Sequence, residues 1–315
     1  MAFQRHDFQR VRFCVQTASM RILVVGATGM LGEPVARKLK DDGYDVRLLA
    51  RDTGAARLMF GGDFEIVTGD VTDPASLLPA MQQCYGVHVN LRGANTLASY
   101  DKVERGGARN IASAAAHCGV RRLAYVSGAG IGDSETNDPL LAIKAAAVAA
   151  IVSSGIDYTI FKPTHFMESL PQFISGHRAT VIGRQPHRYH YLAVTDFADL
   201  VSRSFRMAEA ANKSLTIFGP EAFTMEEALR LYCAAAYPGM SVDHMPVAIA
   251  RLLAAVTGNH DLRFAAMLFA GFSRLGERGD PTLAHRLFGA PRTTLAAWCL
   301  ATAGRQRKAT VPGEK

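Results

Sequence analysis

Three glycines spaced three residues apart carry the strongest chemical signal in this sequence. Gly26, Gly29 and Gly32 follow the apolar run 21–25 and precede residues 34–39, which have the pattern of a helix. Glycines in this context allow a tight turn, a close approach of the backbone to a pyrophosphate, and tight packing of helix on strand. The helix N-terminus would offer free N–H groups to phosphate. The spacing therefore favours a dinucleotide-binding turn over a merely structural glycine turn.

Two charged residues, Arg51 and Asp52, end the next predicted strand, residues 45–50, about twenty residues beyond the glycine turn. An acidic residue at this place would bind a ribose 2′-hydroxyl, whereas an arginine can pair with a 2′-phosphate in bidentate geometry. Because Arg51 comes first, the sequence favours NADP(H) over NAD(H). Asp52 keeps the alternative open, and Arg51 as a merely solvated strand-end charge is the competing interpretation.

Asp70 lies at the carboxyl end of another predicted strand, residues 64–67. There it could bind an adenine amino group or cap the helix that follows. Asp73 directly precedes Pro74 and suits the cap better.

Strands and helices alternate regularly from residue 20 to about residue 220. Further strands are predicted at 86–91, 122–126 and 157–161, and helices at 74–83, 100–118 and about 140–153. This alternation predicts an α/β fold: a doubly wound parallel sheet of the Rossmann type, with ligands at the carboxyl ends of the strands. Residues 221–304 are predicted to form a smaller, mostly helical C-terminal region that covers a substrate pocket.

Several segments resemble one known family. VVGATGMLG, Arg51, GDVTD, YVSGAG, Lys144, IFKPTHFME and YLAVTDFAD resemble the NmrA-like, atypical short-chain dehydrogenase/reductase proteins over about residues 20–220. The segment FGAPRTTLAAW, residues 288–298, is similar to the C-termini of bacterial relatives of the NADPH-binding accessory subunit of respiratory complex I. The first resemblance implies the fold and an NAD(P)-type cofactor.

The resemblance also implies which residues contact the cofactor. They are Gly26, Thr28, Gly29, Met30 and Leu31 at the pyrophosphate, Arg51 at the 2′-phosphate, Asp70 and Val71 at adenine, Leu91, Arg92 and Gly93 behind the cofactor, Ser127 and Lys144 at the nicotinamide ribose, and Pro163, His165 and Phe166 at the nicotinamide end.

The residue expected to donate a proton is missing. Reductases of the broader family use Tyr-x-x-x-Lys, in which the phenol lies one helical turn before the lysine and protonates the reduced carbonyl. Here Leu140 stands four residues before Lys144. Lys144 and His165 are therefore the candidate catalytic residues, with a hydrogen-bonded loop histidine as the alternative for His165.

Two functions are compatible with this pattern. The first is an NADPH-dependent oxidoreductase that acts on a small, apolar carbonyl, quinone or enone. The second is a non-catalytic NAD(P)H-binding redox sensor or assembly and regulatory protein. The complete cofactor motif permits the first, and the missing tyrosine favours the second.

Composition excludes several other classes. The chain has 315 residues, 49% hydrophobic and 20% charged, which is typical of a globular protein. Its net charge is +7, but the basic residues are scattered, so no nucleic-acid partner is expected. Five cysteines without a Cys-x-x-Cys pair favour a reducing cytoplasm over a disulfide framework or zinc site. His187 and His190 lack a carboxylate motif, so no metal is expected.

The remaining expectations concern the termini and partners. Residues 1–19 are predicted to be a disordered or mis-started extension, and residues 305–315 a polar tail. Residues 247–275 are predicted to form helices that act as a lid. Together with Arg278 they carry interspersed arginines, so the alternative is that they bind a membrane surface peripherally or contact a protein partner. We further expect either a small-molecule substrate or none, and a chain that is a monomer or a homodimer.

Overall fold

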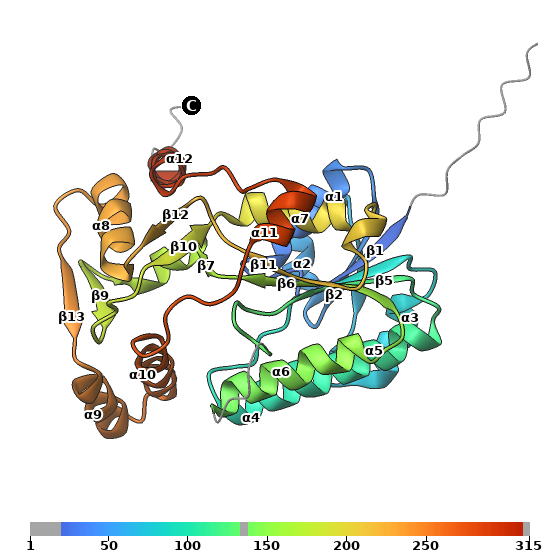
Figure 1. Cartoon of the computed structure of the whole chain (residues 1–315), viewed down its shortest axis with the longest axis horizontal. Coiled ribbons are helices and arrows are strands. Elements are labelled where there is room, and N and C mark those ends of the chain that lie inside the picture. Colours follow the sequence, from blue (N-terminus) through green and yellow to red (C-terminus); the bar gives the residue numbers. More distant parts are fainter. Residues whose placement is uncertain (1–19, 133–137, 311–315) are drawn as a thin grey trace, which may run out of the picture.

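A seven-stranded parallel sheet forms the centre of the larger lobe (Figure 1). The computed structural model describes residues 20–132 and 138–310, so the extension predicted for residues 1–19 lies outside the described residues. The strands lie in the order β11-β6-β5-β4-β1-β2-β3. All of them are parallel, and the direction in which successive strands are added to the sheet changes between β1 and β4. Its strands are β1 (Arg21–Val25), β2 (Asp45–Ala50), β3 (Glu65–Thr68), β4 (Gly86–Val89), β5 (Arg122–Val126), β6 (Asp157–Pro163) and β11 (Lys213–Ile217). The predicted doubly wound parallel sheet is confirmed.

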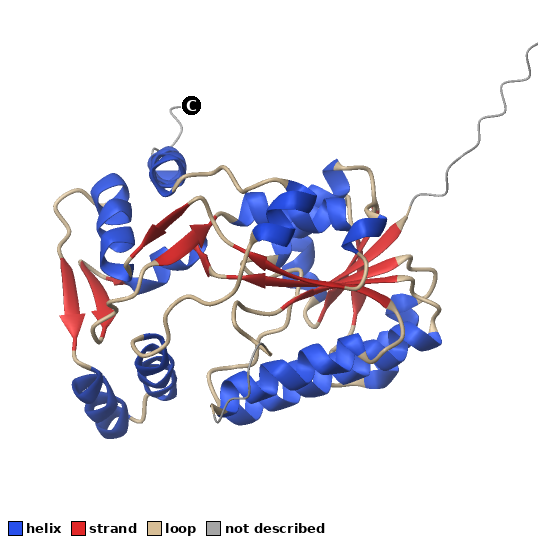
Figure 2. Ribbon diagram, viewed as in Figure 1, coloured by secondary structure: helices blue, strands red, loops and turns tan. Residues whose placement is uncertain are grey.

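Helices cover both faces of this sheet because the strands present apolar side chains to both sides (Figure 2). In β1, Ile22 and Val24 pack in one core, and Leu23 and Val25 pack in the other. The first face carries α1 (Gly32–Asp41), α7 (Val194–Ser204) and α11 (Thr282–Phe288), and the second carries α3 (Pro74–Met81), α5 (Gly107–His117) and α6 (Pro139–Val152). Two short helices, α2 (Thr53–Phe60) and α4 (Leu97–Tyr100), and the 3₁₀ turn Ala208–Ala210 complete this lobe.

The helix predicted at 100–118 is interrupted in its first half. A π-helical turn, η1 (Asp101–Gly106), joins α4 to α5. Asp73 caps α3 as expected, since its Oδ1 accepts the N–H of Ala75 over 3.1 Å.

A second lobe carries two three-stranded sheets as well as helices. Its strands are β7 (His165–Phe166), β8 (Ile174–Ser175), β9 (Arg178–Ile182), β10 (Tyr189–Leu192), β12 (Glu221–Phe223) and β13 (Val242–Met245). Its helices are the 3₁₀ segment η2 (Met167–Phe173), α8 (Met225–Ala236), α9 (Val247–Thr257), α10 (His260–Phe272) and α12 (Leu295–Thr310). Each small sheet draws strands from both sides of residue 220, and α12 runs into the segment predicted as a tail. The boundaries at 220 and 305 stay predictions.

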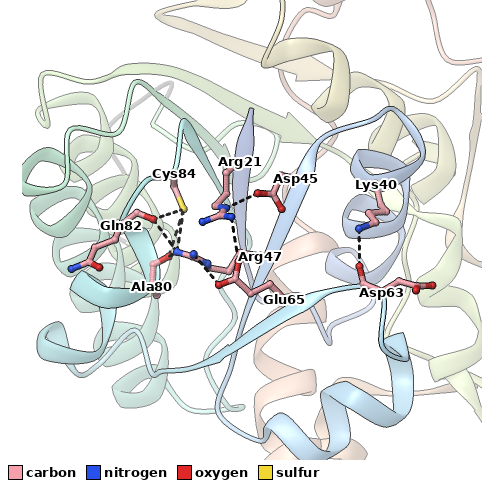
Figure 3. Close-up of polar contacts among 9 residues, drawn as sticks. All are labelled: Arg21, Lys40, Asp45, Arg47, Asp63, Glu65, Ala80, Gln82 and Cys84. Carbon is pink, nitrogen blue, oxygen red and sulfur yellow. Dashed lines mark hydrogen bonds and ion pairs between the residues drawn. The ribbon is translucent and has the colours of Figure 1, made fainter. Parts of the chain in front are cut away.

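Ion pairs hold the amino-terminal edge of the central sheet (Figure 3). Arg21 Nε lies 2.6 Å from Asp45 Oδ2, and Arg47 Nη2 lies 2.8 Å from Glu65 Oε1. Arg47 is buried, and its Nη1 donates to the carbonyl oxygens of Ala80 and Gln82, each over 2.9 Å. These contacts tie the first three strands to the end of α3 at the edge opposite the glycine turn.

No helix within residues 20–132 and 138–310 combines the length and apolar character needed to cross a membrane.

Candidate functional site

The three glycines of the turn between β1 and α1 face different surroundings. Gly26 has φ +79°, and a Cβ there would lie 2.2 Å from the carbonyl oxygen of Asn90. A Cβ on Gly32 would lie 2.0 Å from the carbonyl oxygen of Gly26. These two positions therefore require glycine for the turn and for the packing of helix on strand. A Cβ on Gly29 would meet a single neighbour, the Gly26 oxygen at 3.3 Å, and would otherwise point into open space.

The N-terminus of α1 is prepared for an anion. Thr28, Gly29 and Met30 are exposed beside it. Among the described residues, no protein group accepts a hydrogen bond from the N–H of Met30 or Leu31. Free N–H groups at a helix N-terminus, together with the helix dipole, favour a phosphate at this place. The turn therefore fits a pyrophosphate, which would occupy the space that a side chain at Gly29 would fill.

A cleft of about 560 Å³ opens where the strand order reverses between β1 and β4. The residues that line it follow β1, β2, β3 and β4 at the carboxyl edge of the sheet, where nucleotides bind in doubly wound folds. Eight of the predicted cofactor residues meet here: Gly26, Thr28, Arg51, Asp70, Val71, Leu91, Arg92 and Gly93. The structure thus brings together residues that are separated by up to 67 positions in the sequence.

The two charged residues after β2 have different surroundings. Asp52 is the N-cap of α2, and its Oδ1 accepts the N–H of Ala55 over 2.9 Å. Arg51 is exposed at the cleft, and its guanidinium has no hydrogen-bond or ion-pair partner among the described residues. Lys102 adds a second basic side chain to the same cleft.

Asp70 lies in this cleft as a charged group. The N–H of Thr72 donates to its Oδ1 over 2.8 Å and lowers the pKa of the carboxyl below its ordinary value. The nearby Arg51 and Lys102 lower that pKa further. Asp70 is therefore an anionic acceptor at neutral pH, suited to an amino group such as that of adenine.

A second, mostly apolar pocket of about 220 Å³ lies at the carboxyl ends of β5 and β6. The predicted residues Lys144, Pro163 and His165 line it. Helix α10 and the segment after it close the pocket from the second lobe, with Leu268, Phe272, Leu275, Gly276, Glu277 and Arg278. Of the two helices predicted as a lid, α10 lines this pocket, whereas α9 (Val247–Thr257) contributes no lining residue.

Two other predicted residues lie outside this pocket. The Phe166 ring is buried in the core, with its centroid 5.3 Å from that of Phe197. The alternation of side chains along β7 explains this position, because His165 and Phe166 must point to opposite sides. Ser127 donates its N–H to the Phe161 carbonyl over 2.8 Å, and its buried hydroxyl has no partner among the described residues.

His165 is enclosed by aromatic rings. Tyr189 stacks on it with a centroid distance of 4.5 Å, and Phe272 lies 5.1 Å away. Burial lowers the pKa of His165 to about 4, so the imidazole is neutral at pH 7. A neutral imidazole can accept or donate a hydrogen bond. At pH 7, however, only a small fraction of the protein carries His165 as the imidazolium that a general acid requires.

Lys144 faces the same pocket from α6. Its Nζ donates to both carboxylate oxygens of Glu104, over 2.9 Å to Oε1 and 2.7 Å to Oε2. Leu140, one turn earlier, is buried in an apolar cluster with Tyr100 and Phe264, so this position presents no donor. Glu104 was missed by sequence reasoning because a single glutamate within a long helix resembles a solvated surface residue.

His190 of the second lobe contacts a carboxylate and an aromatic ring. His190 Nδ1 lies 2.5 Å from Glu277 Oε2, and its ring stacks on Phe218. Within the part of the chain that the structure describes, no three His, Cys, Asp or Glu side chains are grouped as metal ligands.

Comparisons with known proteins agree with the geometry of the cleft. A family model described as NAD(P)H-binding matches residues 26–206. Photosystem II assembly factor Ycf39 of Cyanophora paradoxa is 28% identical over 243 residues, 74% of each chain. The (4-alkanoyl-5-oxo-2,5-dihydrofuran-3-yl)methyl phosphate reductase of Streptomyces griseus is 29% identical over 211 residues, 65% of this chain and 70% of that enzyme. The structure of the NADPH-dependent quinone oxidoreductase QOR2 from Escherichia coli, complexed with NADPH, shares the fold with a TM-score of 0.70 at 22% identity, covering 89% of this chain and 99% of QOR2.

Proposed function

Because the chain belongs to the NAD(P)H-binding family, whose model spans residues 26–206, we propose that it binds NADPH and reduces a small, apolar quinone, enone or other carbonyl compound. The observation that carries this proposal is the pair of pockets at the carboxyl edge of one sheet. One contains the glycine turn and basic side chains, and the other is apolar and contains Lys144. This arrangement suits a dinucleotide in the first pocket and an apolar substrate in the second.

The preference for NADPH rests on the residues after β2. An acidic residue selects NADH when its carboxylate is available to the ribose 2′-hydroxyl. The carboxylate of Asp52 is engaged by the N–H of Ala55, whereas the guanidinium of Arg51 is exposed at the cleft. A 2′-phosphate would therefore meet Arg51, whose planar fork suits phosphate.

The class of substrate follows from the absence of the tyrosine that would protonate a reduced carbonyl in the apolar pocket. NADPH, when bound, supplies a hydride. Hydride addition to a simple ketone forms an alkoxide, which requires a positioned proton donor. Leu140 has no ionisable proton, and His165 is neutral at pH 7. The ammonium of Lys144 donates to Glu104. Addition to a quinone or enone forms a delocalised phenolate or enolate, which is stable enough for water to protonate it later. These substrates are therefore favoured over simple ketones.

The experiment that tests this proposal measures the loss of NADPH absorbance with a panel of quinones, enones, aldehydes and ketones. We expect quinones and enones to be reduced at least about a hundredfold faster than ketones, because a positioned general acid contributes roughly 10²–10⁴-fold. Gly29→Leu, which fills the pyrophosphate space, is the matched inactive control. Tight NADPH binding without turnover of any compound in the panel would refute the enzymatic function.

A second candidate function is a non-catalytic assembly or regulatory protein, and the surface of α9 favours it. Ile249, Leu252 and Val256 are 49%, 63% and 77% exposed, and their spacing places them on one face of the helix. Helices this apolar are normally buried. Exposed Arg263 on the adjacent α10 and exposed Arg274, two residues after the end of that helix, add positive charge. Under this function, α9 contacts an anionic membrane surface or a partner protein.

Co-sedimentation with vesicles distinguishes a membrane contact of α9 from a protein contact. We expect the protein to pellet with vesicles of phosphatidylglycerol at low salt, and Leu252→Glu to abolish pelleting. Leu58→Glu, at a leucine that is 91% exposed on α2, is the matched control. An absence of pelleting would leave a protein partner as the contact of α9. A cytoplasmic location, which rests on cysteine usage in the sequence, is part of both proposals.

A further inference from the structure

Lys144 lies between a buried acid and an open pocket. The side chain of Glu104 is 2% exposed, whereas that of Lys144 is 24% exposed and lines the apolar pocket. The two residues are 40 positions apart, on η1 and α6, which pack against each other. An ammonium has three N–H donors, and Glu104 accepts from Nζ through both of its oxygens. The carboxylate therefore fixes the ammonium from its buried side.

The contact is stronger than an ordinary surface ion pair. Burial raises the pKa of Glu104, and Lys144 opposes this effect by stabilising the charged carboxylate. Little water competes for the pair on the Glu104 side. The Tyr100 ring lies 5.5 Å from Nζ and adds a cation–π contact. These contacts favour one position of a side chain that has four rotatable bonds.

The backbone that carries Glu104 also faces the cofactor cleft. Glu104 lies in the π-helical turn η1, and its neighbours Lys102 and Val103 line the cleft that contains the glycine turn. Single π-helical turns within α-helices are frequent at functional sites. One wide turn thus contributes to the nucleotide cleft and holds the lysine of the second pocket.

We propose that Glu104 is a positioning residue for Lys144, which it orients so that the remaining N–H of the ammonium binds the nicotinamide ribose of the dinucleotide. This inference rests on the proposed binding of NADPH. Glu104 itself touches neither cofactor nor substrate, and it acts through the lysine. The pair gives the protein a fixed ribose contact although the tyrosine of Tyr-x-x-x-Lys is absent at residue 140.

Four variants of the full chain test this role: Glu104→Met, Glu104→Gln, Lys144→Met and the double variant Glu104→Met/Lys144→Met. Dissociation constants are measured for NADPH and for adenosine 2′,5′-bisphosphate, a fragment without the nicotinamide ribose. Lys144→Met should weaken NADPH binding about tenfold, the weight of one charged hydrogen bond. Glu104→Met should cause a similar loss, and Glu104→Gln, which keeps one acceptor, a smaller one. The double variant should bind no more weakly than Lys144→Met alone.

The fragment separates positioning from support of the fold. Its affinity should be the same in all variants, because it occupies the cleft of the glycine turn and does not reach Lys144. A parallel loss of fragment binding would mean that Glu104 supports the cleft itself, and the positioning role would be overturned. Unchanged NADPH affinity in Glu104→Met, together with a loss in Lys144→Met, would overturn this inference and leave the proposed function standing. If Glu104→Met does not fold, Glu104→Gln provides the same comparison, and a parent protein that fails to bind NADPH overturns both proposals.

Discussion

Replacing Arg51 by alanine should remove most of the preference for NADPH over NADH. Arg51 is the basic residue that directly follows β2 at the cleft, and it is exposed without a partner among the described residues. The neighbouring Asp52 does not line the cleft, and its Oδ1 caps α2 through the N–H of Ala55. The substitution therefore deletes the phosphate contact and leaves the local backbone held by its cap.

The size of the effect follows from the exposure of Arg51. A hydrogen bond to a charged group is worth about 1.5–3 kcal/mol, and solvent screening at an exposed site favours the lower end. We therefore expect NADPH affinity to fall about tenfold and NADH affinity to stay within about twofold. Because Lys102 lines the same cleft, some attraction for the phosphate should remain, and added salt should weaken it.

Fluorescence titrations with NADPH and NADH, each at low and high salt, measure these constants. Arg57→Ala is the matched control, since Arg57 is an exposed arginine on α2 that does not line the cleft. It should leave both affinities unchanged. A parent protein that binds NADPH and NADH equally, or an Arg57→Ala effect as large as that of Arg51→Ala, would refute the assignment of Arg51.

Three further predictions follow from particular side chains. Gly29→Leu should abolish NADPH binding with little change in melting temperature. Gly32→Ala should lower the melting temperature, because its Cβ would meet the Gly26 oxygen at 2.0 Å. Calorimetry that found the two variants equally stable would contradict these separate roles of Gly29 and Gly32. Leu140→Tyr should destabilise the protein by about 1–3 kcal/mol through overpacking against Phe264 and should give no ketone reductase activity; a gain in that activity would show that the pocket can use a phenol. Burial lowers the pKa of His88 from 6.5 to about 3, so the unfolded chain binds a proton that the folded chain does not. Stability should fall by about 2 kcal/mol from this histidine between pH 7 and pH 5, and denaturation of His88→Leu should show a correspondingly smaller pH dependence.

The sequence was most informative where function depends on contacts between neighbouring residues. The roles of Gly26, Gly29 and Gly32 follow from a strand, a turn and a helix that are consecutive in the chain, and the structure distinguishes them by what a Cβ would meet. The cap formed by Asp73 was predictable for the same reason, because its partner is two residues away. The eight residues of the cleft were predictable as a group since each follows a strand of one parallel sheet.

The sequence was least informative where a side chain depends on a distant partner. The residue that holds Lys144 lies 40 positions earlier, on a π-helical turn. The aromatic rings that keep His165 neutral come from residues 189, 191 and 272, and the position of Phe166 depends on a strand of two residues. Short strands such as β7 and β8 offer too few residues for an alternating pattern to be recognised.

The threading of the second lobe restricts how this protein can recombine with its relatives. The sheet β12-β10-β7 and the sheet β13-β9-β8 each combine strands that precede β11 with one strand that follows it. A chimera joined near residue 220 would therefore build both small sheets from two parents, and their facing side chains would have been selected in different backgrounds. Exchange of substrate pockets within the family should consequently succeed when residues 165–192 and 221–304 are transferred together, and fail when the C-terminal segment is transferred alone.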